Sequence, residues 1–158
     1  MQLKSKILLV SLGLAGALLT GCSSVDLNPN GPDSEYAGDP FTNPNSPLSQ
    51  QSIYFAFDSY TVPAESQAMI EAHAQYLATH PSATVVLEGN TDERGGREYN
   101  LALGQKRSDS VENRLQLLGV PADRMESVSF GKERPRALGH DEESYQQNRR
   151  VDIIYRTK

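Results

Sequence analysis

The 158-residue sequence contains no tryptophan, a single cysteine and three histidines. One cysteine cannot form a disulfide bond within the chain. The histidines His73, His80 and His140 lack the spacing of metal ligands, and without a second cysteine a zinc site is not expected. These residues therefore predict no metal and no cofactor.

Patterns typical of several function classes are also missing. The net charge is −5, and the part that follows Lys4 and Lys6 is more acidic still, which disfavours binding to nucleic-acid phosphates. No serine lies in a nucleophile-elbow motif. The pair Gly95-Gly96 is not followed by the Lys-Ser/Thr of a phosphate loop. The sequence therefore predicts a protein that is not an enzyme.

The long apolar run of the sequence lies at its N-terminus. Lys4 and Lys6 precede the apolar segment 7–19, which has the length of a signal-peptide core and is short for a transmembrane helix. The run Leu-Thr-Gly-Cys that ends at Cys22 resembles the lipobox of bacterial lipoproteins. We predict that residues 1–21 are a cleaved signal peptide. The alternative is an ordinary secretory signal with an incidental cysteine.

The lipobox resemblance implies that Cys22 becomes the N-terminus, with a diacylglycerol on its sulfur and a further acyl chain, such as palmitate, on its amine. Several acyl chains anchor a protein stably where one chain is marginal. Ser23 follows the cysteine. In Gram-negative lipoproteins an aspartate there tends to mean retention in the inner membrane, so Ser23 predicts an outer-membrane anchor with the domain facing the periplasm.

Residues 22–50 have the composition of a linker. They are rich in proline, asparagine, glycine, serine and aspartate, and their apolar residues follow neither a helical nor a strand period. Such a segment cannot bury a core of its own. We therefore predict a lipidated N-terminus and flexible linker over 22–50, and a folded domain over 51–158.

From residue 52 onward, apolar residues recur with the periods of strands and helices. Strands are predicted near 53–57, 84–87, 128–130 and 151–155, the two main helices begin near Pro63 and Asn100, and a short helix follows Asp141. Gly104 and Ser108 would let the second main helix lie close to a sheet. This order predicts an α/β two-layer sandwich, a mixed four-stranded sheet with both main helices on one face.

Candidate binding residues gather in the polar stretch 89–100, between a predicted strand and a helix. On that helix, Arg107 lies one turn from Leu103 and from Val111, so its guanidinium flanks the apolar stripe and needs an anionic partner. The loop can bring Asp92 near Arg107. The two then form either an internal salt bridge or a receptor for a zwitterion, with Asp92 on an ammonium and Arg107 on a carboxylate.

Short motifs after residue 89 carry a resemblance to a known family. They are Asn90-Thr91-Asp92-Glu93-Arg94-Gly95, Glu98-Tyr99-Asn100, Gly131-Lys132-Glu133-Arg134-Pro135, Leu138-Gly139-His140-Asp141-Glu142 and Asn148-Arg149-Arg150. With Arg107, they resemble the OmpA-like C-terminal domains, and among these the peptidoglycan-associated lipoproteins of the Tol-Pal system, over about residues 50–158. Two positions depart from the pattern: Asn90 stands where many relatives have histidine, and Gly96 where threonine is frequent.

The resemblance implies a function and a site. It implies that Asp92 and Arg107 hold the meso-diaminopimelate of the peptidoglycan stem peptide. The same pocket would be lined by Phe57, Asp58, Glu93, Arg94, Leu103 and Arg149. The chain would then be a non-catalytic tether between outer membrane and cell wall, with TolB and TolA as partners in membrane integrity and in constriction at cell division.

Two other functions stay open at this stage. One is an OmpA-like cell-wall-binding lipoprotein outside the Tol system. The other is a lipid-anchored cell-wall hydrolase that uses Asp58 and Asp92 as paired acids, since two carboxylates can perform acid and base catalysis.

Overall fold

The computed structural model describes residues 39–157. The predicted signal peptide, Cys22 and the predicted linker up to residue 38 lie outside this range. The strands are β1 (Ser52–Tyr54), β2 (Thr84–Asn90), β3 (Met125–Gly131) and β4 (Arg150–Thr157), and the α-helices are α1 (Gln67–Thr79), α2 (Arg97–Leu117) and α3 (Glu142–Asn148). Short 3₁₀ helices are η1 (Pro47–Ser49), η2 (Ala64–Ser66) and η3 (Ala122–Arg124). Within residues 39–157, no helix combines the length and apolarity needed to span a bilayer.

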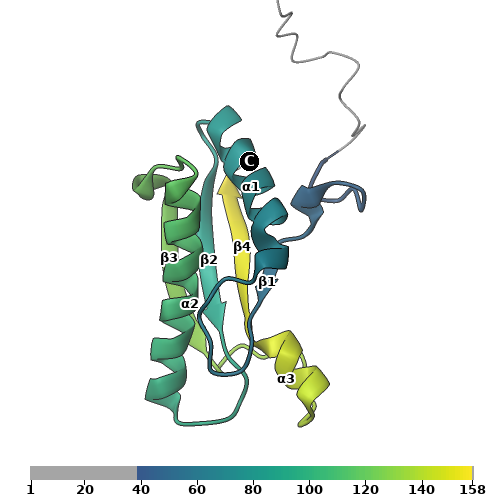
Figure 1. Ribbon diagram of the computed structural model, residues 1–158, viewed down its shortest axis with the longest axis vertical. Coiled ribbons are helices and arrows are strands. Elements are labelled where there is room, and N and C mark those ends of the chain that lie inside the picture. Colours follow the sequence, from purple (N-terminus) through teal and green to yellow (C-terminus); the bar gives the residue numbers. More distant parts are fainter. Residues whose placement is uncertain (1–38, 158) are drawn as a thin grey trace, which may run out of the picture. The chain divides into compact units, whose positions relative to one another are not determined.

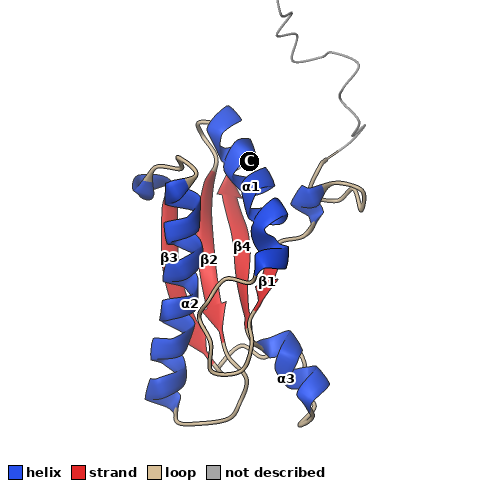
Figure 2. Ribbon diagram, viewed as in Figure 1, coloured by secondary structure: helices blue, strands red, loops and turns tan. Residues whose placement is uncertain are grey.

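The four strands form one mixed sheet in the order β1-β4-β2-β3. β2 runs parallel to β3, while β4 lies antiparallel to both β2 and β1. Helices α1 and α2 cover the same face of this sheet (Figures 1 and 2). The predicted two-layer sandwich, with a mixed four-stranded sheet and two main helices on one face, is confirmed.

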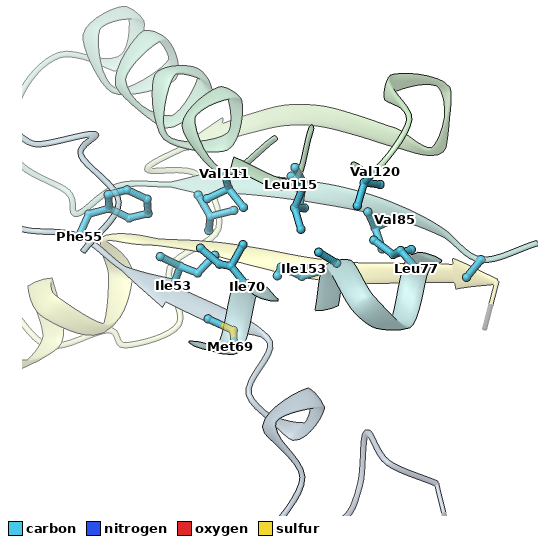
Figure 3. Close-up of a cluster of buried hydrophobic side chains, with 14 residues drawn as sticks. Ile53, Phe55, Met69, Ile70, Leu77, Val85, Val111, Leu115, Val120 and Ile153 are labelled. Carbon is cyan, nitrogen blue, oxygen red and sulfur yellow. The ribbon is translucent and has the colours of Figure 1, made fainter. Parts of the chain in front are cut away.

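The hydrophobic core fills the space between the two helices and the sheet (Figure 3). Ile53 and Val151 are partners across β1 and β4, and Leu87 and Ile153 are partners across β2 and β4; all four side chains are fully buried. Alternate strand residues point to this face because the side-chain period of a strand is two. Burying each such side chain contributes about 1.5–3 kcal/mol of stability.

Helix α2 lies unusually close to β2. A Cβ atom placed on Gly89 would sit 1.9 Å from the carbonyl oxygen of Gly104, so glycine is required there. The predicted role of Gly104 in close packing against the sheet is confirmed. This close packing brings Arg107, three residues further along α2, to the end of β2. Its Nη1 donates to the carbonyl oxygen of Asn90 at 2.9 Å.

The folded part of the chain begins earlier than predicted. Residues 39–50, assigned to the linker from composition, pack on the domain. Phe41 is only 8% exposed and its ring lies 4.9 Å from that of Tyr76 and 4.6 Å from that of Tyr155, centroid to centroid. His73 Nε2 also bonds the carbonyl oxygen of Gln50 at 2.8 Å. The predicted boundary at residue 51 was wrong. The composition of residues 39–50 is polar and rich in proline, and it does not reveal that one aromatic ring, that of Phe41, packs on the domain.

The first strand is shorter than predicted. It ends at Tyr54, although Phe55 still donates its N–H to the carbonyl oxygen of Arg149 at 2.8 Å. Asp58 has a φ of 54°, a left-handed conformation that interrupts any extended run. Phe57 is consequently 62% exposed and does not join the core. The alternation of Ile53, Phe55 and Phe57 predicted a longer strand because exposed and buried phenylalanines look alike in a sequence.

Candidate functional site

A cavity of about 200 Å³ opens near the ends of β1 and β2, beside the first turns of α2. It is lined by Phe57, Asp58, Thr91, Asp92, Arg94, Gly95, Tyr99, Asn100, Leu103, Arg107 and Arg149. Seven of the eight residues predicted to form the binding site are among them; Glu93 is not. The volume suits the head group of an amino acid better than a drug-sized ligand, for which pockets of roughly 300–1,000 Å³ are usual.

Arg107 is fully buried at the bottom of this site. Its guanidinium donates to three backbone carbonyl oxygens, from Nε to Ser59 at 2.7 Å, from Nη1 to Asn90 at 2.9 Å and from Nη2 to Ala56 at 3.2 Å. Three of its five N–H groups are used in this way, so Nη1 and Nη2 each keep one more. Arg107 thereby holds the segment after β1 against the end of β2.

Arg107 has no carboxylate partner within residues 39–157, since it takes part in none of the ion pairs formed there. Burial, aided by the charge of Arg149, lowers the pKa of Arg107 to about 10, while Asp92 and Asp58 oppose this shift. The group is still charged at neutral pH. The salt-bridge alternative for Asp92 and Arg107 is therefore wrong in this structure, since the two face one cavity without bonding each other.

The carboxylate of Asp92 is 4% exposed and bonds two other arginines. Its Oδ2 accepts from Arg94 Nη2 at 2.6 Å and from Arg149 Nη1 at 3.2 Å, and its Oδ1 accepts from the N–H of Arg94 at 3.1 Å and from Nε of the same residue at 3.3 Å. Burial raises the pKa of Asp92, but these hydrogen bonds outweigh burial and leave the pKa below its ordinary value. Asp92 is thus held ionised.

The buried side chain of Arg149 connects the end of β1, the loop after β2 and α3 through hydrogen bonds. Besides Asp92, its Nε donates to the carbonyl oxygen of Phe55 at 3.1 Å and its Nη2 to Glu142 Oε1 at 2.7 Å, with a further bond to Gln146. Its side chain is only 3% exposed. The predicted pocket residue Arg149 therefore fixes the position of Asp92 and of α3 at once.

Aromatic rings surround the mouth of the cavity. The guanidinium carbon of Arg94 lies 4.3 Å from the ring centroids of both Phe57 and Tyr145. Tyr99 donates its hydroxyl to Asp58, whose left-handed backbone turns the carboxylate toward α2. Leu103 supplies an apolar wall from α2. Most of these contacts join residues from segments that are distant in the sequence.

Glu93 does not line this cavity. Its side chain leaves the cavity and accepts from His140 Nδ1 at 2.7 Å and from the Tyr145 hydroxyl at 2.8 Å. These hydrogen bonds lower the pKa of Glu93. The chain bends at Glu93, and the side chain of Glu93 points away from the cavity that Asp92 faces.

Several site residues received no role from sequence reasoning. Thr91, Gly95, Tyr99 and Asn100 line the cavity, and Glu142, Tyr145 and Gln146 support it from α3. The first four lie in the polar stretch 89–100 that the sequence had marked. The sequence predicted α3 itself from Asp141 as its N-terminal cap. The structure confirms this cap, since Asp141 Oδ1 accepts from the N–H of Ser144 at 2.8 Å. Among residues 39–157, no three histidine, cysteine, aspartate or glutamate side chains are grouped to hold a metal ion.

Comparison with known proteins places the chain among cell-envelope proteins. A model of the OmpA family matches residues 54–149. A peptidoglycan-associated lipoprotein from Pasteurella multocida is 41% identical over 158 residues, which is 98% of this chain and 100% of the relative. A protein of the same name from Haemophilus influenzae is 43% identical over 149 residues, covering 92% of this chain and 96% of the relative.

Solved structures agree with these relatives. The crystal structure of the peptidoglycan-associated lipoprotein from Burkholderia pseudomallei matches with a TM-score of 0.72 and 58% identity, over 74% of this chain and 99% of that chain. The C-terminal domain of Helicobacter pylori MotB matches with a TM-score of 0.63 over 69% of this chain and 86% of that chain, at 22% identity. The second likeness concerns the fold alone.

Proposed function

Because the chain belongs to the OmpA family, and within it to the peptidoglycan-associated lipoproteins, we propose that it binds peptidoglycan without forming a covalent bond, through the cavity between Asp92 and Arg107. The ligand is the meso-diaminopimelate of the stem peptide. The lipid on Cys22 holds the other end of the chain in the outer membrane. The protein is then a tether between that membrane and the cell wall.

The observation that carries this proposal is the buried guanidinium of Arg107, which lines the cavity and has no carboxylate partner in the described part of the chain. Its two remaining N–H groups suit a ligand carboxylate, because guanidinium–carboxylate hydrogen bonds are charge-assisted. Asp92, held ionised across the same cavity, suits an ammonium group. The side-chain stereocentre of meso-diaminopimelate bears an ammonium and a carboxylate on one carbon, and the cavity has the size for this end of the molecule.

The site argues against a hydrolase. A glycosidase with paired acids needs one carboxyl group that is protonated at working pH, and so a raised pKa. The pKa of Asp92 is lowered instead, by its hydrogen bonds to Arg94 and Arg149. Asp58 is exposed and accepts from the Tyr99 hydroxyl. We therefore assign the chain no enzymatic activity.

Membership of this group also supports the partners and the place in the cell that the sequence predicted. We propose that the domain faces the periplasm and works with TolB and TolA in outer-membrane integrity and constriction at division. Pull-down of TolB by the lipidated chain and by its soluble form tests this part. Absence of binding in both forms would place the protein outside the Tol system.

Sedimentation with intact peptidoglycan sacculi tests the wall-binding function. The soluble chain, residues 23–158, should sediment with sacculi and release no soluble fragments from them. Asp92→Asn should abolish sedimentation, whereas Arg97→Ala, at an exposed position outside the cavity, should leave it unchanged. Circular dichroism must show that both variants are folded. Wild-type binding by folded Asp92→Asn, or release of fragments by the unmodified chain, would refute the proposal.

A further inference from the structure

The carboxylate of Asp92 has no capacity left for a ligand. An ionised carboxylate offers about four lone-pair sites to donors. Three are used by Arg94, through its N–H and its guanidinium, and the fourth by Arg149. An incoming ammonium group can therefore bond Asp92 only if one of these donors leaves.

The two arginines differ in how easily they can leave. The side chain of Arg149 is 3% exposed, and it holds a carbonyl oxygen and two side chains of α3 in addition to Asp92. The side chain of Arg94 is 37% exposed. Apart from Asp92, its guanidinium forms one ion pair, between Nη1 and Glu142 Oε2 at 3.4 Å. Arg94 is therefore the donor that can swing out, while its backbone N–H can stay on Asp92.

The place that the Arg94 guanidinium occupies has the features of a cation site. The rings of Phe57 and Tyr145 flank it at 4.3 Å each, and the carboxylates of Asp92 and Glu142 lie beside it. Aromatic faces and carboxylates together favour a positive group, by cation–π attraction and by ion pairing. In this structure, the site is filled by a cation of the chain itself.

We propose that Arg94 is an internal substitute for the ammonium group of the ligand, and that ligand binding displaces its guanidinium from Asp92. The proposal rests on the proposed function and adds a selection step to it. A ligand must offer an ammonium group that competes with a guanidinium already in place. A dicarboxylate without amines can approach Arg107 but cannot open the site at Asp92.

The first test compares affinities for free meso-diaminopimelate by calorimetry. Arg94→Met removes the competing guanidinium and keeps an unbranched side chain between the two rings. In the unmodified chain, ligand binding must break the hydrogen bonding between the Arg94 guanidinium and Asp92. The variant lacks this bonding before the ligand binds, so it should bind roughly tenfold more tightly. Arg97→Met is the matched control and should bind as the unmodified chain does. About 0.5 M salt screens the long-range effect of the lost charge.

Each outcome of this test has one meaning. If Arg94→Met binds as tightly as the unmodified chain, or more weakly, the displacement proposal is overturned while the proposed function stands. If the unmodified chain and Arg97→Met both fail to bind meso-diaminopimelate and wall fragments, the proposed function and the displacement proposal fall together.

A second test follows Arg94 in the unmodified chain. The ¹⁵N and ¹H resonances of its Nε–H report the hydrogen bond to Asp92 directly. Saturation with meso-diaminopimelate should move these resonances to the positions of a solvent-exposed arginine, whereas pimelate, which has the two carboxylates and no amine, should leave them in place. Resonances that stay unchanged at saturation with meso-diaminopimelate would overturn the proposal without any mutation.

Discussion

Replacing Phe41 by alanine should destabilise the domain, although the sequence assigns this residue to the linker. The ring is 8% exposed and makes edge contacts with Tyr76 and Tyr155. Phenylalanine-to-alanine changes in cores cost about 3–5 kcal/mol. Phe41 lies close to where the described chain begins, at residue 39, so its surroundings can relax, and we expect the lower end of this range, about 3 kcal/mol.

Urea unfolding followed by circular dichroism measures this loss. With a slope of about 1.5 kcal/mol per M, typical of a small domain, 3 kcal/mol corresponds to a midpoint lowered by about 2 M. The matched control is Phe57→Ala. The alternation of apolar residues in the sequence, taken alone, would place Phe57 in the core. Phe57 is 62% exposed and stacks on Arg94, so this change should cost less than about 1 kcal/mol. A midpoint for Phe41→Ala within about 0.3 M of that of the unmodified chain would refute the assignment of Phe41 to the core.

Further expectations concern packing, pH and the buried arginine. Gly89→Ala should cost more than about 3 kcal/mol or prevent folding, because its Cβ would meet a backbone oxygen at 1.9 Å, whereas Gly96→Ala, with nothing within 4 Å, should be neutral in the same urea assay. Burial lowers the pKa of His73, so the folded chain disfavours the proton that an unfolded histidine binds below about pH 6.5. Stability should therefore be complete above that pH and fall toward pH 5.5, and His73→Phe should flatten this dependence; a variant with the original slope would assign it to other groups. Arg107→Lys should lose meso-diaminopimelate binding in calorimetry and about 2–4 kcal/mol of stability, because an ammonium cannot reproduce three divergent bonds to backbone oxygens. Retained affinity in the lysine variant would show that point charge alone suffices.

The layers of the fold could be predicted because their signals are local. Strand β4 turns Val151, Ile153 and Tyr155 toward the core, and Asp152 and Ile154 toward the opposite face of the sheet. The helix after Asp141 follows from one capping carboxylate. Such patterns depend on residues two to four positions apart, and the structure has little freedom to override them.

The bonding within the site could not be predicted in the same way. The sequence predicted that Asp92 and Arg107 come close together, and both line one cavity, but it left open whether they form a salt bridge with each other. Arg107 instead bonds carbonyl oxygens of Ala56, Ser59 and Asn90, which only the packing of α2 brings together. The bond between Asp92 and Arg94 depends on the path of a loop, and no period encodes that path.

The packing of residues 39–50 also decides how the molecule meets mechanical load. In the proposed tether, tension arrives from the N-terminal side and is resisted at the proposed binding cavity. Between these points lies β1, an edge strand held by the short antiparallel pairing of Ser52–Tyr54 with β4. Force reaches the Phe41 contacts and the Gln50–His73 bond before it reaches that strand. These contacts therefore take up a load from the N-terminal side before β1 does, and they protect the short pairing of that edge strand from being pulled apart.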